Sequence, residues 1–324
     1  MAAGKCVAEK SSVAMVDFWR SDYDPLANPI VKSFSRQGLG LTRDVRRADV
    51  TVASVFGREH WRSRGRVVLF SGEPYFRDQF ADFTIDCRFL GRTNHLRLPL
   101  WAYSAIGLSP QVSQTETSEK TRFCNFIYSN PRGAMRNAFY EQLNAKRSVD
   151  SLGSVMNNRV EPRLGKRNNR DWHSSKFAVL RDYRFTVAFE NTELPGYTTE
   201  KMVDAWIAGS VPIYWGNPAF AIDFPPNSCL SLYEAGSLNK LVEQVLEAEN
   251  EPERYAQLQA ANPFRTGAAL AAVQRYQTDL EEFTKLVMGD VQGKSRRFPR
   301  GDLPRLYEYS KVATRKVVNL TSGD

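Results

Sequence analysis

Residues 185–218 read FTVAFENTELPGYTTEKMVDAWIAGSVPIYWGNP and carry the clearest fold information in the chain. The apolar run at 185–189 predicts a buried strand, 199–208 a helix, and 211–215 a second strand. A strand, a polar turn and a helix in this order bring a loop to a sheet edge and present the free N–H groups of the helix to an anion. Lys201 lies in the first turn, where a cation opposes the helix dipole, so we expect an anion nearby.

The same stretch contains a distinctive motif. Asn191, Tyr197, Glu200 and Lys201 stand in the frame F-E-N-T…Y-T-T-E-K, which is followed by V-P-I-Y-W-G. This frame resembles the α1,3-fucosyltransferases of glycosyltransferase family 10, and the bacterial members in particular. Four further blocks resemble the family in the expected order: VDFW at 16–19, SGE at 71–73, LRLPL at 96–100 and FCNFIYSNPRGAMRNAFY at 123–140.

The first half of the chain predicts a mainly parallel α/β sheet. Strand-sized apolar runs at 12–18, 49–56, 66–71, 82–87 and 123–128 alternate with segments long enough for helices, one of them at 30–37. In the second half we expect a helix near 174–181, a strand near 229–232, and helices near 236–249, 251–260 and 266–288.

The family resemblance implies a GT-B fold, in which two Rossmann-like domains face a central cleft. The polar stretch 151–173 suggests a boundary near residue 150. We therefore expect an acceptor-binding domain at 1–150, a GDP-fucose-binding domain at 151–290 and a basic tail at 291–324.

Charge is concentrated at the C-terminus. The 324 residues have a net charge of +8, and residues 294–324 hold eight Lys and Arg against three Asp and Glu. With aromatic residues among its cations, this tail either contacts an anionic membrane surface or packs back on the protein. No apolar stretch is long enough to span a membrane, and no signal-peptide core precedes the first strand, so we expect a cytoplasmic protein, peripheral to the inner membrane if the tail binds lipid.

Metal and disulfide chemistry find little support in the sequence. The four cysteines are scattered without C-x-x-C spacing, which favours buried thiols, and only three histidines are present. Asp22 and Asp24 spell D-x-D, a metal-binding pattern of other glycosyltransferases, but turn-forming aspartates before Pro25 are the favoured interpretation. We expect no required cofactor and no metal site; stimulation by divalent ions stays open.

Glu73 is the predicted general base. It follows an apolar strand at the sheet edge and occupies the family's G-E position. Transfer from GDP-β-L-fucose to an α-linked product inverts configuration, so a carboxylate must take the proton of the attacking hydroxyl. A solvated turn glutamate before Pro74 is the alternative.

The family resemblance implies that the other candidate residues form the site for the donor, GDP-fucose. Lys201 and Arg136 are expected to stabilise the departing diphosphate, with Arg132 as a rival to Arg136. The alternative for each is a surface cation. Glu200 would contact the ribose or the positive charge that develops on fucose, or simply favour the helix start.

Three further residues complete the expected site. Asn191 and Tyr197 would contact the donor, or be an ordinary turn asparagine and a buried tyrosine. Glu190 either orients the loop or ends the strand.

The resulting hypothesis is an inverting α1,3-fucosyltransferase that joins L-fucose to a GlcNAc hydroxyl of a Galβ1-4GlcNAc-type glycan on lipopolysaccharide or capsule, giving a Lewis-type product. Two alternatives remain: the same fold with another GDP-sugar or acceptor linkage, and a non-catalytic basic protein that binds glycan or nucleic acid. Because most of the excess charge lies in the tail and no nucleic-acid motif is visible, we expect no nucleic-acid partner.

Overall fold

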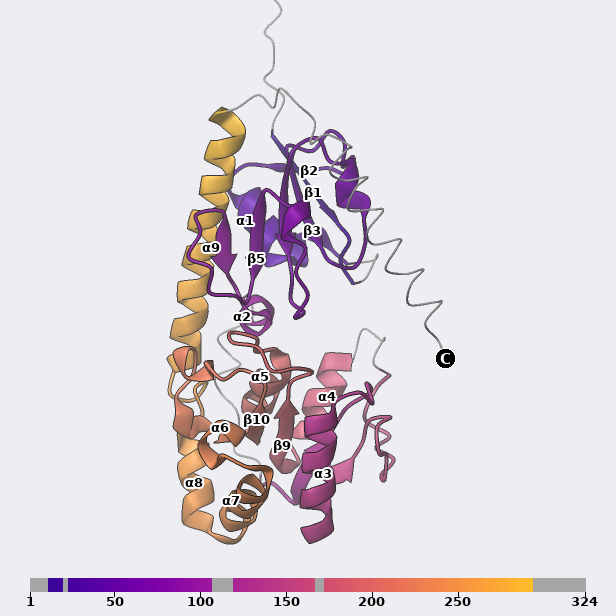
Figure 1. Cartoon of the computed structure of the whole chain (residues 1–324), viewed down its shortest axis with the longest axis vertical. Coiled ribbons are helices and arrows are strands. Elements are labelled where there is room, and N and C mark those ends of the chain that lie inside the picture. Colours follow the sequence, from indigo (N-terminus) through magenta and orange to yellow (C-terminus); the bar gives the residue numbers. More distant parts are fainter. Residues whose placement is uncertain (1–10, 20–22, 107–118, 167–171, 294–324) are drawn as a thin grey trace, which may run out of the picture.

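The computed structural model describes residues 11–19, 23–106, 119–166 and 172–293. Two sheets made entirely of parallel pairs follow one another along these residues, one in each half of the molecule (Figure 1). The basic tail and the segment around Asp22 lie outside the described residues. Within the described ranges, no helix is both long enough and apolar enough to cross a bilayer.

The first sheet has the order β2-β1-β3-β4-β5-β6. Its strands are β1 (Ser12–Val16), β2 (Gly40–Leu41), β3 (Val50–Ser54), β4 (Arg66–Phe70), β5 (Phe83–Asp86) and β6 (His95–Arg97). All five residues of β3 are buried, as an apolar run in a sheet covered on both faces requires. Because neighbouring strands are parallel, the loops that leave their carboxyl ends share one edge of the sheet.

The second sheet has the order β11-β10-β9-β7-β8. Its strands are β7 (Arg122–Phe126), β8 (Asp150–Ser151), β9 (Tyr183–Phe189), β10 (Val211–Trp215) and β11 (Leu230–Ser231). The helices of this half are α3 (Ala134–Lys146), α4 (Trp172–Leu180), α5 (Glu200–Ile207), α6 (Leu232–Ala235), α7 (Leu238–Asn250) and α8 (Pro252–Ala260).

The boundary predicted near residue 150 is wrong for these sheets. β7 and α3 precede that position, yet β7 pairs with β9 in the second sheet. The change from one sheet to the other therefore falls between β6 and β7. The described residues of the polar stretch 151–173 lie inside the second half, at and after its edge strand β8, so this stretch does not mark a domain boundary.

The last helix returns to the first half. α9 (Ala268–Gly293) runs along one side of the molecule past both sheets (Figure 1). It packs on α1 (Pro29–Arg36), where the hydroxyls of Ser33 and Thr284 lie 2.7 Å apart. α9 also contacts α2 (Leu100–Ala105), which in turn packs on α5. Because α9 packs on helices of the first half, residues 151–290 do not form one separate domain.

The two halves share a buried ion pair. Arg97 at the end of β6 donates to Asp223 (Nη2 to Oδ2, 2.7 Å), and the hydroxyl of Tyr276 on α9 donates to Oδ1 of the same carboxylate (2.6 Å). The Asp223 side chain is fully buried. Removing one partner of such a pair would leave a buried charge uncompensated, so this contact fixes the halves relative to each other.

Candidate active site

The loop that joins β9 to α5 is held against the end of β10. The backbone N–H of Glu190 donates to the carbonyl of Trp215, and that of Leu194 to the carbonyl of Gly216, both at 2.8 Å. Gly216 has a φ of +143°, and a Cβ there would lie 2.4 Å from Cβ of Glu190. Only glycine fits this position without strain. The chain therefore enters α5 along a fixed path.

Glu190 is a fully buried carboxylate at the start of α5. Its Oε1 accepts from the backbone N–H of Thr199 (2.8 Å) and both oxygens accept from the Thr199 hydroxyl (3.0 and 2.9 Å). Oε2 also accepts from Nζ of Lys201 at 2.9 Å. Burial raises the pKa of Glu190, and the charge of Lys201 opposes that rise. Glu190 thus lies behind the first turn of α5 and orients it.

Lys201 is a mostly buried cation between carboxylates. Burial lowers its pKa, but Glu190 and Glu200 outweigh that effect, and the pKa of Lys201 lies above its usual value. Burial raises the pKa of Glu200, but the positive charges of Lys201 and Lys176 lower it to below its usual value. Lys201 and Glu200 are therefore both charged at neutral pH. The anion that the sequence led us to expect beside Lys201 is therefore supplied in part by the protein itself.

Arg136 is buried near the start of α3. Its guanidinium lies over the ring of Tyr128 (4.3 Å) and donates from Nη1 to Oδ1 of Asn191 (3.0 Å) and from Nη2 to the carbonyl of Asn130. Among the described residues Arg136 forms no ion pair, and its Nε finds no hydrogen-bond partner there. Burial lowers the pKa of Arg136. A buried cation that forms no direct ion pair is costly, which indicates a place for an anionic ligand.

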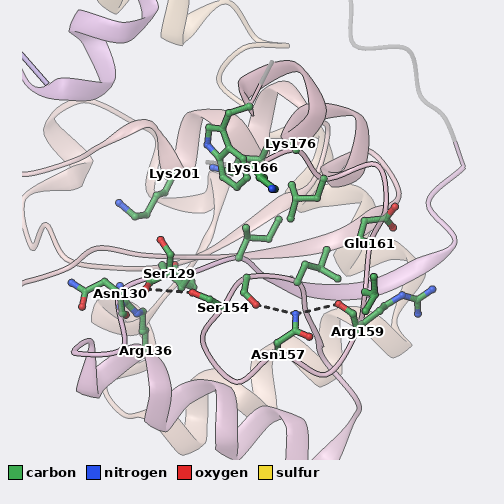
Figure 2. A pocket seen from close by; sticks show the side chains of 18 of the residues that line it. Ser129, Asn130, Arg136, Ser154, Asn157, Arg159, Glu161, Lys166, Lys176 and Lys201 are labelled. Carbon is green, nitrogen blue, oxygen red and sulfur yellow. Dashed lines mark hydrogen bonds between the residues drawn. The ribbon is translucent and has the colours of Figure 1, made fainter. Parts of the chain in front are cut away.

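A pocket of about 630 Å³ opens beside these cations, a size typical of small-molecule sites. The residues that line it come from the ends of β7 and β8, the loop after β8, α3, α4, α5 and the loop after β9: Ile127, Tyr128, Ser129, Asn130, Arg136, Leu152, Gly153, Ser154, Asn157, Arg159, Val160, Glu161, Leu164, Gly165, Lys166, Trp172, Lys176, Asn191, Glu200 and Lys201. Five cations face two carboxylates in this set. Figure 2 shows Lys201, Lys176 and Lys166 on one side of the pocket and Arg136 on another.

The predicted donor residues divide into two groups. Arg136, Asn191, Glu200 and Lys201 all line the pocket, although they come from separate segments of the chain. Glu190 does not line it and acts from behind Lys201. Arg132, the rival to Arg136, is exposed.

Glu73 and Tyr197 meet where the two halves face each other. Tyr197 is buried, and its hydroxyl lies 3.4 Å from Oε2 of Glu73, a long hydrogen bond that joins the loop before α5 to the first sheet. Burial and the nearby carboxylates raise the pKa of the Tyr197 phenol, so it remains protonated and donates. Glu73 lies in the turn after β4, where the Ser71 hydroxyl donates to the carbonyls of Glu73 and Tyr75. Neither Glu73 nor Tyr197 lines the pocket of Figure 2.

Several pocket residues were missed from the sequence. Lys176 on α4 pairs with Asp204 at 2.7 Å, and Arg159 pairs with Asp150 at 3.3 Å. Asn157 donates from Nδ2 to the carbonyls of Gly153 and Arg159 and so shapes the loop after β8 (Figure 2). The Asn- and Arg-rich composition of the loop after β8 is also that of an ordinary surface loop, so it did not single out these residues.

The structure describes Asp24 and three of the four cysteines, for which a turn and buried thiols were predicted. Asp24 accepts from the backbone N–H of Leu26 at 2.9 Å, which confirms its turn-forming role. Cys87, Cys124 and Cys229 are buried free thiols, as predicted. Within the described ranges, no group of three or more His, Cys, Asp or Glu side chains is placed to hold a metal ion.

Two facing halves with parallel sheets define the class of GT-B glycosyltransferases. The chain resembles the crystal structure of an α1,3-fucosyltransferase with GDP-fucose at a TM-score of 0.64 and 22% identity, over 85% of this chain and 94% of that one. This likeness confirms the predicted fold. Residues 117–262 match the family model described as glycosyltransferase family 10 (fucosyltransferase) C-term.

Curated relatives named for fucose transfer match part of the chain. An alpha-(1,3)-fucosyltransferase of Helicobacter pylori is 34% identical over 148 residues, 45% of this chain and 29% of the relative. GDP-fucose protein O-fucosyltransferase 3 of Bos taurus is 30% identical over 122 residues, 37% of this chain and 25% of the relative. The matches thus span less than a third of either relative's length.

Proposed function

We propose that the protein is an inverting fucosyltransferase that uses GDP-β-L-fucose. The observation that carries the proposal is the buried guanidinium of Arg136, which lacks an ion pair among the described residues and lies in the wall of a cationic pocket. A diphosphate would supply the missing anion, with Lys201 as a second contact. Both relatives are named for fucose transfer although their named reactions differ, which supports the donor more strongly than the acceptor.

The donor would lie along the pocket. Its apolar lining, which includes Ile127, Leu152 and Leu164, suits the faces of a guanine base. The diphosphate would then reach Arg136 and Lys201, with the fucose beyond them toward Glu73. Fixed cations at this position stabilise the leaving group most as its charge develops, so they lower the barrier and do more than bind the ground state.

The proposed chemistry is a single displacement. The acceptor oxygen forms a bond to the anomeric carbon of fucose as the bond from that carbon to the β-phosphate oxygen breaks, and GDP keeps the electron pair. The acceptor proton passes to Glu73, which lies in the first half of the molecule and is joined to the loop before α5 by the hydrogen bond from Tyr197. The Tyr197 hydroxyl orients this carboxylate. Attack opposite the leaving group converts a β-linked donor into an α-linked product.

Glu200 and Asn191 would complete the donor site. The Glu200 carboxylate is ionised, as its lowered pKa shows, so it can accept hydrogen bonds from ribose hydroxyls or stabilise positive charge on the fucose ring. Asn191 holds one nitrogen of Arg136 and keeps an amide N–H₂ to donate.

The proposal extends to the acceptor glycan and the product. We infer transfer to a GlcNAc hydroxyl of a Galβ1-4GlcNAc unit, as on lipopolysaccharide, giving a Lewis-type structure. Because two cations already face the leaving group, no metal is required, and a divalent ion would stimulate at most. The cytoplasm is the proposed location, with the basic tail contacting anionic lipid, as its sequence charge suggests.

The test measures GDP release from GDP-fucose in EDTA, with and without N-acetyllactosamine. Wild type should turn over only with acceptor. Arg136→Met should lose GDP binding and turnover, and the exposed Arg132→Met should lose neither. Glu73→Gln should bind GDP normally and lose turnover by at least a hundredfold.

Each alternative predicts a different result. Turnover with another GDP-sugar in place of GDP-fucose would change the donor, and turnover with a peptide in place of the glycan would change the acceptor class. A wild type that binds no GDP would refute the proposal.

A further inference from the structure

Four exposed aromatic residues follow four neighbouring strands of the first sheet. Trp19 follows β1, Phe56 follows β3, Tyr75 follows β4 and Phe89 follows β5, with exposed fractions of 43%, 50%, 50% and 49%. Since these strands are parallel, all four residues stand at the carboxyl edge of the sheet, the edge that also holds Glu73. Such a gathering of exposed aromatic rings at a site edge indicates recognition of a ligand.

Two of these rings form a supported pair. The rings of Trp19 and Phe56 meet edge to face with centroids 5.7 Å apart. Behind them lie the buried rings of Phe70 and Tyr103, which stack at 4.3 Å, and Trp19 contacts both. The exposed faces therefore rest on a packed base and lose little freedom when a ligand covers them.

The backbone below the pair is also fixed. Asp17 has a φ of +62°, and its carboxylate accepts from the backbone N–H groups of Glu59 (2.9 Å) and His60 (3.0 Å). Oδ2 of Asp17 also lies 2.5 Å from Nδ1 of the buried His60 ring. These bonds tie the segment after β1 to the turn after β3, so Trp19 and Phe56 are held at a constant spacing.

We propose that Trp19 and Phe56 bind a second sugar unit of the acceptor, next to the unit whose hydroxyl reaches Glu73. This inference rests on the proposed function. The ring centroids of Trp19 and Phe70 are 6.5 Å apart, and Phe70 precedes Glu73 by three residues, a backbone span of at most about 11 Å that adds to the ring distance. The pair thus lies within reach of a neighbouring sugar. The acceptor is then an oligosaccharide read beyond the position of transfer.

The chemistry of the surface favours a sugar over lipid or peptide. A pyranose ring presents C–H groups on one face and hydroxyls at its edge, and the C–H face is attracted to the negative face of an aromatic ring. Apart from the Trp19–Phe56 pair, the exposed aromatic residues lie on separate loops and give no continuous apolar area of the kind that a membrane contact needs. Tyr75 and Phe89 already have arginine guanidinium groups over their rings, at 4.8 and 4.3 Å, so the free stacking surface is that of the Trp19–Phe56 pair.

The experiment compares acceptor length with aromatic variants. Binding of GlcNAc, N-acetyllactosamine and a tetrasaccharide of two such units is measured by titration calorimetry with GDP present. The variants are Trp19→Ala, Trp19→Phe and Phe56→Ala, and Leu286→Ala on α9 is a control of similar exposure (45%). Wild-type affinity should rise at least tenfold from the monosaccharide to the longer glycans. Trp19→Ala and Phe56→Ala should reduce that gain to under threefold, whereas Trp19→Phe and Leu286→Ala retain it.

Monosaccharide and GDP affinities should be equal in all four variants, which shows that the site and the fold are intact. A length dependence that survives Trp19→Ala would overturn the inference, as would loss of it in Leu286→Ala. The inference would also be overturned if the wild type binds GDP but binds glycans of no length. Burial of Trp19 by anionic vesicles and not by glycan would overturn it as well. Failure of GDP binding refutes the proposed function separately, because GDP affinity is measured in its own titration.

Discussion

Replacing Glu190 by glutamine tests whether this buried carboxylate positions the cation of the donor site. The substitution keeps the shape and leaves one oxygen to accept from the backbone N–H of Thr199. It removes the charge that faces Nζ of Lys201 at 2.9 Å. A hydrogen bond to a charged group contributes about 1.5–3 kcal/mol against about 1 kcal/mol for a neutral one, so the variant should lose about 1–2 kcal/mol of unfolding free energy.

The effect on catalysis should exceed the effect on binding. Without Glu190 the Lys201 ammonium keeps Glu200 as its charged neighbour but loses the contact that holds it at the start of α5. A misplaced cation still attracts a diphosphate, so GDP affinity should change by less than about threefold. The charge that develops on the leaving group would be stabilised less well, and a loss of about 1.4–2 kcal/mol lowers kcat about ten- to thirtyfold.

Urea unfolding, GDP titration and steady-state kinetics measure these three quantities. Glu193→Gln is the matched control: it lies on the same loop, is exposed and contacts only the indole N–H of Trp215 in the hydrogen bonds described here. It should leave stability, GDP affinity and kcat unchanged. If Glu190→Gln retains wild-type kcat, or if GDP affinity falls as steeply as kcat, then Glu190 does not act by positioning Lys201 and the reasoning is refuted.

Three further predictions concern stability. Hydrogen bonds from a neighbouring arginine lower the pKa of Glu161 to about 2, below an unfolded value of about 4.3. The stability that ionised Glu161 contributes is therefore complete above about pH 4.3 and is lost as the pH falls toward 2. Glu161→Gln should flatten the acid limb of a plot of unfolding free energy against pH. Gly216→Ala should cost about 2–4 kcal/mol in urea unfolding, against about 1 kcal/mol for Gly236→Ala, whose Cβ meets no atom within 4 Å. Asp223→Asn should cost about 3–5 kcal/mol by calorimetry, and an unchanged Tm would show that the interdomain ion pair is dispensable.

Most strands of the two sheets were predictable because their own residues form continuous apolar runs. Continuous apolar runs predicted β3, β4 and β10 within two residues, and Gly209, whose φ is +70°, ends α5 as expected for a helix C-terminus. Short pairings were not predicted: β2, β6 and β8 have two or three residues each, too few for a hydrophobic period. The position of α9 was also hidden, because its amphipathic pattern does not say which sheet it covers.

The site was predictable where its residues lie in one segment and not where the fold assembles it. Asn191, Glu200 and Lys201 are close in sequence and line one pocket. Lys176 and Arg159 reach the same pocket from segments whose composition is that of ordinary loops and surface helices. Their contribution depends on carboxylates elsewhere in the chain that hold them in place, and such pairs cannot be read from local sequence.

The dipole argument for Lys201 correctly predicts a nearby anion but does not say whether that anion is a ligand or a protein side chain. A cation in the first turn of a helix does need an anion, and the structure provides Glu190 at 2.9 Å. Lys201 alone therefore gives no reason to expect a diphosphate. Arg136 does, because it is more deeply buried than Lys201 in the same site and forms no ion pair among the described residues. The case for a phosphorylated donor thus depends on the arginine that the sequence could not distinguish from a surface cation.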